Sequence, residues 1–420
     1  MDITILGEPR YTSPVKRIVS DKIRIPEIIK IDPDKPATSR LVFEMAGPRA
    51  MLYFDPEQTR AGIVTCGGLC PGLNNVIRSV FLELHYAYGV KEVLGFRGGY
   101  TGLDPARAKP PIRLTPEIVD IIHKEGGTLL GTSRGPVDVA LAVSNLINLR
   151  INILFVVGGD GTQRGGNELY QEAKKRGYDL SVVGIPKTID NDVAFVARTF
   201  GYLTAVEEAE KVLSRAHVEA RSVENGISLV KLMGRHAGFI TAGATIACQD
   251  VNFALVPEVP FKLEGPRGFL AALKERILTR AHALVVVAEG AGQDLIENTS
   301  VEHDASGNVK AKDIGLFLRE KIESFFREEK IPIVMRYIDP GYLIRSSPAD
   351  AEDAVLCDMF ARNAVHAAMA GKTGLVIGYL HDKFIHVPID LLTSRKKYMK
   401  PDSSLWNAAL SATGQPARFE

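Results

Sequence analysis

The sequence predicts an α/β protein built on mostly parallel β-sheet with helices on both faces. Short apolar runs recur along the chain, and longer amphipathic stretches lie between them. Continuous apolar strands that alternate with helical patterns are typical of βαβ units, whose parallel sheets are buried on both faces. In such sheets ligands bind at the carboxyl ends of the strands, and glycines cluster directly after several of these runs.

Length, charge and cysteine content narrow the class of protein. At roughly 150 residues per domain, 420 residues predict two or three domains. The formal net charge is +1, which argues against a general binder of nucleic acid or anionic membranes, so an anionic ligand must be held by a local site. Four cysteines are too few for a disulfide framework, the first residues lack a secretory signal pattern, and no apolar run reaches the ~20 residues that span a bilayer. We expect a cytoplasmic protein.

The predicted elements follow from these patterns in chain order. Residues 1–60 contain charged and proline-rich stretches and are expected to form an irregular N-terminal arm. The polar residues 290–313 are expected to form a long surface loop, for which a lid role stays open. The predicted strands cover residues 62–65, 151–157, 180–185, 227–232, 283–288 and 374–380, and the predicted helices include residues 74–88, 165–176 and 205–220.

The first glycine-rich segment follows the strand at residues 62–65. Residues 65–74 read Thr-Cys-Gly-Gly-Leu-Cys-Pro-Gly-Leu-Asn and lead into a predicted helix. Glycines allow backbone N–H groups and a helix N-terminus to approach an anion closely, although a merely tight turn would look the same. Cys66 and Cys70 are expected to pack in the interior, because no second cysteine pair and no zinc-like histidine spacing accompany them.

The second segment is Gly-Gly-Asp-Gly-Thr at residues 158–162, directly after the apolar run 153–157. It offers an open backbone, one carboxylate and one hydroxyl at the end of a buried strand, which suits the phosphates of a nucleotide and their Mg²⁺. The alternative is a turn with an Asx cap. Because the motif occurs in more than one kinase family, it indicates a kinase without naming the substrate.

The third segment is Pro-Lys-Thr-Ile-Asp-Asn-Asp at residues 186–192. Phosphoryl transfer to an alcohol requires a base near the hydroxyl, a metal linked to carboxylates, and cations near the transferred group. We predict Asp190 as the base and Asp192 as a group that supports the metal or the structure. A polar loop that caps the next helix is the alternative.

These segments, together with Gly-Thr-Ser-Arg-Gly at residues 131–135 and Met-Gly-Arg at 233–235, resemble the 6-phosphofructokinases over about residues 61–388. Residues 46–49 with Tyr53 and Phe54 resemble the plant and trypanosomatid ATP-dependent branch. The resemblance implies two Rossmann-like lobes with the active site in the cleft between them. It implies a nucleotide-binding lobe at 61–201 plus about 346–395, a sugar-phosphate lobe at 202–345 and a C-terminal tail at 396–420.

The resemblance also implies the reaction, which is transfer of the γ-phosphoryl group of MgATP to the 1-hydroxyl of fructose 6-phosphate in glycolysis. Asp190 would accept the hydroxyl proton, Thr188 would contact the transferred phosphate, and Arg134 would stabilise its charge. Mg²⁺ would be linked to Asp160. The implied nucleotide-binding residues are Gly67, Gly68, Arg134, Gly135, Gly159, Asp160, Gly161 and Thr162. The implied sugar-phosphate residues are Thr188, Ile189, Asp190, Met233, Gly234, Arg235, Glu289, Arg336, Tyr342 and Arg345.

The resemblance also implies a homodimer or homotetramer, because in the family the sugar-phosphate site often receives the arginine at the position of Arg336 from a neighbouring subunit. It implies an allosteric enzyme as well. A surface ion pair is the alternative for Arg336. The sequence departs from the bacterial enzymes at Gly226, where they place a second arginine that reaches across the subunit boundary. Lys231 and Arg221 lie nearby, and the sequence favours neither as its replacement.

The phosphoryl donor is the open choice within the family. Enzymes that use pyrophosphate typically carry aspartate at the position of Gly161, where a carboxylate would repel an ATP phosphate, and Lys187 is compatible with either donor. We therefore predict ATP, with pyrophosphate as the alternative and a non-catalytic sensor of sugar phosphate as the second alternative. The basic residues 394–400 are expected to be solvated, although binding of an effector anion or a neighbour stays open.

Overall fold

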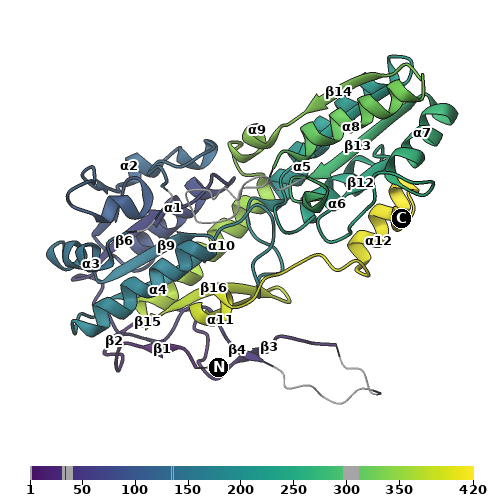
Figure 1. The fold of residues 1–420 in the computed structure, drawn as a ribbon. Helices are drawn as coiled ribbons and strands as arrows, with labels where there is room; N and C mark the ends of the chain where they lie inside the picture. The colour runs from purple at the N-terminus through teal and green to yellow at the C-terminus, as the bar shows by residue number, and fades with distance from the viewer. Residues whose placement is uncertain (1, 31–33, 35–40, 134, 136, 297–311) are drawn as a thin grey trace. The chain divides into compact units, whose positions relative to one another are not determined.

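The chain divides into two compact units in the computed structural model, which describes all residues except 1, 31–33, 35–40, 134, 136 and 297–311 (Figure 1). Unit 1 comprises Met1–Thr188, Val193–Gly201 and Ser347–Lys396, and unit 2 comprises Ile189–Asp192, Tyr202–Ser346 and Lys397–Glu420. Both units have parallel sheet and packed helices, so the predicted fold class is confirmed. Among the described residues, no helix is both long enough and apolar enough to cross a bilayer.

The main sheet of unit 1 has nine strands within the described residues. Its central strands from β16 to β7 are parallel, and antiparallel strands extend it at both edges. The predicted strands at 62–65, 151–157, 180–185 and 374–380 are confirmed within this sheet. In spatial order the strands are β3 (Arg24–Pro26), β4 (Val42–Met45), β17 (Lys383–Pro388), β16 (Leu375–Leu380), β10 (Ser181–Pro186), β9 (Ile153–Gly158), β6 (Arg60–Thr65), β7 (Glu92–Gly95) and β8 (Ile112–Arg113).

Helices cover both faces of this sheet. Leu154, Val156 and Val182 on one face pack in a buried cluster with α3 and α4, while α10 packs against α1 and against β9 and β10. A π-helical turn, Glu83–Ala87, continues α1, so the helix predicted at 74–88 is regular only in its first part. The helices of unit 1 are α1 (Leu73–Leu82), α2 (Pro116–Val119), α3 (Val139–Asn148), α4 (Asp160–Lys175), α10 (Ala351–Met369) and α11 (Ile389–Thr393).

Residues 1–60 form more regular structure than the sequence indicated. Strands β3 and β4 extend the main sheet, and of two further pairs of two-residue strands one joins the N-terminal segment to residues 372–373 and the other lies within the segment. A largely buried ion cluster anchors the same segment: Glu44, Arg49, Lys372 and His386 are buried, and the exposed Asp21 pairs with both Arg49 and Lys372. The composition of the segment did not reveal this, because its partners lie more than 300 residues away. The two further pairs are β1 (Thr4–Ile5) with β15 (Lys372–Thr373) and β2 (Tyr11–Thr12) with β5 (Met51–Leu52).

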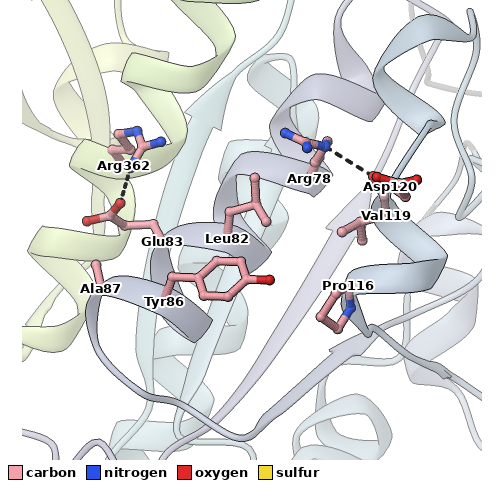
Figure 2. A pocket seen from close by; sticks show the side chains of 9 residues that line it. All are labelled: Arg78, Leu82, Glu83, Tyr86, Ala87, Pro116, Val119, Asp120 and Arg362. Carbon is pink, nitrogen blue, oxygen red and sulfur yellow. Dashed lines mark hydrogen bonds and ion pairs between the residues drawn. The ribbon is translucent and has the colours of Figure 1, made fainter.

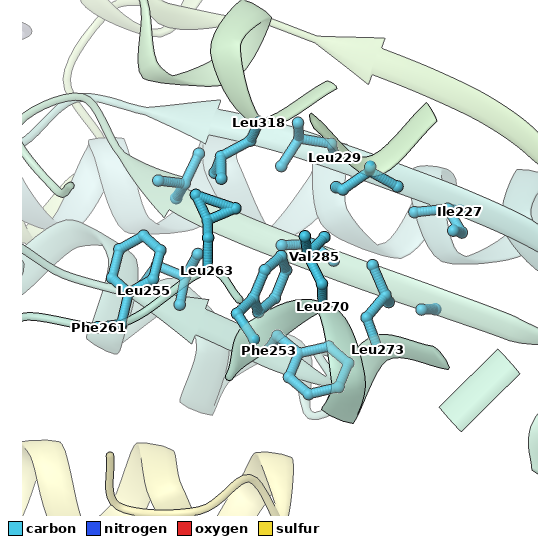
Figure 3. Packing of buried hydrophobic residues seen from close by; sticks show 14 of the residues in the cluster. Ile227, Leu229, Phe253, Leu255, Phe261, Leu263, Leu270, Leu273, Val285 and Leu318 are labelled. Carbon is cyan, nitrogen blue, oxygen red and sulfur yellow. The ribbon is translucent and has the colours of Figure 1, made fainter. Parts of the chain in front are cut away.

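Unit 2 is built on a parallel sheet in the order β12-β13-β11-β14. On one face Ile227, Leu229 and Val285 pack with apolar residues of α7 and α8, as Figure 3 shows. The predicted strands at 227–232 and 283–288 are confirmed as β11 and β13. The elements are β11 (Gly226–Leu232), β12 (Phe253–Leu255), β13 (His282–Ala288), β14 (Val334–Ile338), α5 (Tyr202–Arg221), α6 (Phe239–Cys248), α7 (Phe269–Arg280), α8 (Ile314–Glu328), α9 (Gly341–Arg345) and α12 (Ser404–Thr413).

The C-terminal segment is a packed part of unit 2. Helix α12 lies against α6, and its Trp406 side chain is only 2% exposed. Gln415 pairs with the backbone of Ala254 in both directions, at 2.7 Å to the N–H and 3.1 Å to the carbonyl oxygen. Phe419 belongs to the same buried apolar cluster as Phe253 and Phe269. Most of the long loop predicted at 290–313 lies outside the described residues.

Candidate active site

The functional residues predicted from sequence fall into two sets, one in each unit. In unit 1 three loops follow the adjacent parallel strands β6, β9 and β10. Thr65 pairs with Val157, and Pro186 pairs with Gly158, so the three strands end at the same edge of the sheet. The sheet therefore gathers the three glycine-rich or charged segments that the sequence singled out.

The loop after β6 depends on backbone conformations that favour glycine. Gly67 has φ +84°, and Gly72, which precedes α1, has φ +99°. A Cβ atom at Gly72 would lie 2.4 Å from Cys357 Sγ, so no larger residue fits there. Thr132 donates a hydrogen bond from Oγ1 to the carbonyl oxygen of Gly67 at 2.6 Å, which ties this loop to residues 131–133. Of the neighbouring predicted residues, Gly135 is exposed, and Arg134 lies outside the described residues.

The loop after β9 opens into the N-terminus of α4. The helix begins at Asp160, and Gly159 precedes it with extended backbone. Asp160 is half-buried, Gly161 is exposed, and the nearest atom to a Cβ at Gly161 would be an Arg164 guanidinium nitrogen at 3.9 Å. Thr162 is buried instead, because it packs against Gly158, where a Cβ would lie 2.4 Å from its Oγ1. The open side of this turn presents helix N–H groups and one carboxylate, which suits phosphate and Mg²⁺.

The loop after β10 joins the other two through Lys187. Its backbone N–H donates to the carbonyl oxygen of Gly158 at 3.0 Å, and its Nζ donates to the carbonyl oxygen of Gly68 at 2.6 Å. The side chain is 7% exposed, so this ammonium lies inside the loop cluster rather than in solvent. The carbonyl oxygen of Thr188 accepts a hydrogen bond from Thr199 Oγ1 at 2.8 Å, which holds the chain just before Asp190.

The residues present fit a magnesium ion held mainly by substrate. Within the described part of the chain, no group of three or more histidine, cysteine or acidic side chains could hold a metal by itself. Mg²⁺ commonly binds through one or two carboxylates together with substrate phosphates, rather than through an all-protein cage. Asp160 at the open end of α4 can supply such a carboxylate.

In unit 2 the predicted sugar-phosphate residues follow two adjacent strands. Met233, Gly234 and Arg235 follow β11, and Glu289 follows β13. Leu232 pairs with Ala288 across these parallel strands, and the Glu289 N–H donates to the carbonyl oxygen of Leu232 at 2.9 Å. Gly234 has φ +130°, and a Cβ there would lie 2.6 Å from the carbonyl oxygen of Ala237. This compact turn places the backbone N–H of Arg235 at the strand ends.

Asp190 joins the same group in unit 2. Its Oδ2 accepts a hydrogen bond from the backbone N–H of Arg235 at 3.3 Å. Burial raises the pKa of Asp190 to about 8, and the negative charges of Asp192 and Glu289 add to this effect. Burial also raises the pKa of Glu289, although the positive charge of Arg345 opposes the rise. A carboxylate with a pKa near neutral pH is suited to accept a proton from a hydroxyl group.

Arg345 and Tyr342 both belong to the short helix α9. The Arg345 guanidinium lies 4.7 Å from the centroid of the Tyr342 ring, and its Nε donates to the carbonyl oxygen of Gly341 at 3.3 Å. The Tyr342 side chain is 80% exposed. A planar guanidinium held in this way can present paired N–H donors to phosphate oxygens.

Arg336 and Lys231, two basic residues considered from sequence for the sugar-phosphate site, form ion pairs with carboxylates of the chain. Arg336 on β14 is exposed and pairs through Nε with Glu219 at 3.2 Å. Lys231 lies between two carboxylates, at 2.7 Å from Asp313 Oδ2 and 2.9 Å from Asp339 Oδ2. The structure also explains the glycine at position 226: a Cβ atom at Gly226 would lie 2.1 Å from the carbonyl oxygen of Ala220. An arginine at this position would therefore require a different backbone.

One pocket in unit 1 is lined by none of the predicted site residues. Figure 2 shows a pocket of about 510 Å³ between α1, α2 and α10. Arg362 forms ion pairs with Glu83 and Asp358, and Arg78 donates from Nε to the carbonyl oxygen of Val119 at 3.1 Å. Because protein groups already bind the guanidinium groups of both arginines, we favour the three loops over this pocket as the anion-binding site. Its lining residues are Arg78, Leu82, Glu83, Tyr86, Ala87, Pro116, Val119, Asp120 and Arg362.

Sequence reasoning missed one residue beside Asp190. The Nζ of Lys397 donates a hydrogen bond to Asn191 Oδ1 at 3.0 Å, and burial lowers the pKa of this lysine to about 7. Lys397 is one of four basic residues at 394–400, and nothing in that local pattern distinguishes the lysine that turns inward.

Comparisons with known proteins agree with this architecture. The family model described as Phosphofructokinase matches residues 60–368 of the chain. ATP-dependent 6-phosphofructokinase 7 of Arabidopsis thaliana is 44% identical over 411 residues, which cover 97% of this chain and 84% of that protein. The ATP-dependent 6-phosphofructokinase of Trypanosoma brucei brucei is 46% identical over 380 residues, which cover 90% of this chain and 77% of that protein. These relatives confirm the resemblance to the plant and trypanosomatid enzymes.

The solved structures extend the likeness to the fold alone. The crystal structure of the pyrophosphate-dependent phosphofructokinase of Marinobacter aquaeolei matches with a TM-score of 0.71 at 19% identity, and the match covers 85% of this chain and 91% of that one. At this level of identity the likeness supports the α/β architecture and carries no information on the phosphoryl donor.

Proposed function

This chain belongs to the phosphofructokinase family, and we propose that it transfers the γ-phosphoryl group of MgATP to the 1-hydroxyl of fructose 6-phosphate, a step of glycolysis. It is thus a phosphotransferase with an alcohol acceptor. The observation that carries the proposal is Asp190, a carboxyl group whose pKa is raised to about 8 and which the backbone of Arg235 holds in place. Such a group can accept a proton near neutral pH.

The residues of unit 2 provide the acceptor side of the reaction. Asp190 takes the proton from the 1-hydroxyl as the oxygen attacks the γ-phosphorus, and Glu289 accepts hydrogen bonds from sugar hydroxyls. Arg235 and Arg345 provide guanidinium groups for the 6-phosphate, and a planar guanidinium matches the geometry of phosphate oxygens. Met233, Gly234 and Ile189 form the backbone around these side chains.

The residues of unit 1 provide the donor side. Gly67, Gly68 and the turn at 159–162 bind the nucleotide phosphates through backbone N–H groups, and the N-terminus of α4 favours their negative charge. Asp160 and the substrate phosphates would hold Mg²⁺, which would supply positive charge beside the transferred group. Thr188 contacts the transferred phosphate, and Arg134 stabilises the charge that develops on it, as the family resemblance implies.

The proposal includes an assembly of identical subunits and a cytoplasmic location. The Arg336 side chain is exposed and pairs with Glu219 at the surface, so it is available to the sugar-phosphate site of a second copy in a dimer or tetramer. All four cysteines are buried and free, as is common for proteins of a reducing compartment.

A coupled ADP-release assay tests the reaction directly. The purified chain is mixed with MgATP and fructose 6-phosphate, and the product is identified as fructose 1,6-bisphosphate. Parallel reactions replace ATP by pyrophosphate, omit the sugar phosphate, or omit Mg²⁺. We expect turnover only with ATP, acceptor and Mg²⁺ together. Turnover with pyrophosphate alone would reassign the donor, and tight binding of the substrates without any turnover would indicate a sensor.

A further inference from the structure

Lys397 forms hydrogen bonds with Asn191 and Asp192, the two residues that follow the proposed base Asp190. Its Nζ donates a hydrogen bond to Asn191 Oδ1 at 3.0 Å, and its backbone N–H donates to the carbonyl oxygen of Asp192 at 3.1 Å. The neighbouring Lys396 and Lys400 are exposed. One residue of the C-terminal segment thus contacts the turn of Asp190 through both its side chain and its backbone.

The start of α6 fixes the position of Lys397. Its Nζ lies 5.0 Å from the centroid of the Phe239 ring, the first residue of that helix. Glu258 accepts hydrogen bonds from the backbone N–H of Met399 at 2.9 Å and from that of Gly238 at 3.0 Å, so one carboxylate joins the C-terminal segment to the beginning of α6. The ammonium therefore lies in a packed environment where its direction is defined.

The turn that Lys397 contacts has an uncommon backbone conformation. Asn191 has φ +57°, in the left-handed region, and its side chain is only 5% exposed. Asparagine tolerates this region better than most residues, partly because its short amide side chain can form local hydrogen bonds. Here the amide oxygen accepts from Lys397, which holds the residue between Asp190 and Asp192 in one orientation.

We propose that Lys397 is a positioning residue for phosphoryl transfer, which fixes the turn at Asn191 and thereby aims the carboxylate of Asp190 at the hydroxyl group of the acceptor. This inference rests on the proposed function, in which Asp190 is the base. Displacement of a reacting group by about 1 Å can cost on the order of 100-fold in rate, so a positioning residue outside the reaction centre can have a large effect.

The test compares Lys397→Met with Lys397→Arg in the full-length enzyme. Methionine keeps much of the apolar volume over Phe239 and removes the hydrogen-bond donor, whereas arginine keeps a donor. We expect Lys397→Met to lower kcat by about 10- to 100-fold and to leave KM for ATP and for fructose 6-phosphate within about threefold. Lys397→Arg should recover part of kcat, and Lys396→Met, which changes an exposed neighbour, should retain wild-type kinetics.

A second variant tests the same hydrogen bond from the other side. Asn191→Gly keeps a residue that adopts positive φ and removes the amide acceptor, so it should also lower kcat without a large change in either KM. The double variant Lys397→Met with Asn191→Gly should be no slower than the slower single variant, because both changes remove one interaction. If Lys397→Met does not fold, Asn191→Gly alone tests whether this hydrogen bond supports kcat.

The outcomes separate this inference from the proposed function. An active wild-type enzyme whose Lys397→Met variant keeps its kcat overturns the positioning role alone. The positioning role is also overturned if kcat falls only in those variants whose melting temperature falls as well. It is overturned too if the losses in kcat of the two single variants multiply in the double variant. A wild-type chain that transfers no phosphoryl group from any donor overturns the proposed function and the inference together.

Discussion

The ammonium group of Lys187 donates a hydrogen bond to the carbonyl oxygen of Gly68 at 2.6 Å, although 119 residues separate the two in sequence. This contact joins the loop after β10 to the loop after β6. A Cβ atom on Gly67 would lie 3.3 Å from the same Nζ, so the lysine supports the loop where it turns. The proposed phosphate-binding backbone therefore depends on a charged side chain from another motif.

The first prediction concerns this contact. Lys187→Met should raise KM for ATP about tenfold, because a hydrogen bond from a charged donor contributes roughly 1.5–3 kcal/mol. KM for fructose 6-phosphate should change by less than about threefold, since the lysine supports the donor loops. Steady-state kinetics with each substrate varied in turn check this, with Lys175→Met on the exposed end of α4 as the control. An unchanged KM for ATP would remove Lys187 from this role.

The second prediction separates charge from size at position 161. A Cβ atom there would lie 3.9 Å from its nearest neighbour, Arg164, and the backbone is not in the left-handed region, so both Gly161→Asp and Gly161→Asn should fold. Gly161→Asp should lower kcat/KM for ATP by at least about 100-fold, and the asparagine variant should lose much less, because only aspartate repels the phosphates. Binding of fructose 6-phosphate should be preserved in both. Equal losses in the two variants would assign the effect to size.

The third prediction tests the base. Asp190→Ser should lower kcat by about 10²- to 10⁴-fold, as expected when a general base is lost, while KM for ATP stays within about threefold. Rapid-quench measurement of the first turnover shows whether the chemical step itself has slowed. A variant that keeps most of its turnover would exclude Asp190 as the base.

The fourth prediction follows from the raised pKa of the same residue. Burial raises the pKa of Asp190 to about 8 in the folded chain, against 3.8 as its ordinary value. Between these two pH values the folded state holds a proton that the unfolded state has released, so the free energy of unfolding falls as pH rises. Asp190→Asn has no such titration. The difference in melting temperature, Asp190→Asn minus wild type, should therefore increase by roughly 4 °C or more between pH 5 and pH 8. Above pH 8 this difference should level off.

This pH dependence is measured by thermal unfolding without substrates. Asp179→Asn changes an exposed carboxylate of unit 1 that accepts a hydrogen bond from the Tyr53 hydroxyl at 2.7 Å, and it serves as a control for the replacement of a carboxylate by an amide. A constant difference between Asp190→Asn and wild type would show that the carboxyl group titrates in its ordinary range.

The fifth prediction concerns the largely buried ion cluster that anchors the N-terminal segment. Burial alone would raise the pKa of Glu44, but hydrogen bonds and charges from His386 and Lys372 outweigh it and hold the pKa well below its usual range. Glu44 lies 2.8 Å from Lys372 and 2.6 Å from Arg49. Glu44→Gln should lower the free energy of unfolding by about 3 kcal/mol at pH 7, since it removes the buried carboxylate that Arg49 and Lys372 share, whereas their other carboxylate partner, Asp21, is exposed.

Because the pKa of Glu44 is depressed, its contribution is present above the ordinary value of 4.5 and is lost as pH falls below it. The difference between Glu44→Gln and wild type in chemical denaturation should therefore shrink on acidification. Glu27→Gln removes a partner of the partly exposed pair with Arg395 and should cost less than about 1 kcal/mol. Equal losses in the two variants would contradict the account.

Local patterns were enough to predict the elements that present the candidate site. The apolar run at 153–157 followed by Gly158 and Gly159 predicts a buried strand that ends in an open turn, and the structure has β9 and the start of α4 there. The catalytic and binding roles assigned to Asp190, Asp160 and Arg345 stay predictions, because they rest on the family resemblance and on the chemistry of each site.

The α/β class, the main strands and the family can be predicted from sequence, because apolar periodicity and glycine motifs are local properties of the chain. The contacts between distant segments appear only in the folded chain: Lys187 with Gly68, Lys397 with Asn191, and the N-terminal segment with Lys372. The folded chain also explains Gly226, whose neighbour Ala220 leaves no room for a side chain. Such contacts depend on strand order and on close packing between elements, and neither property is encoded in the spacing of residues along one chain.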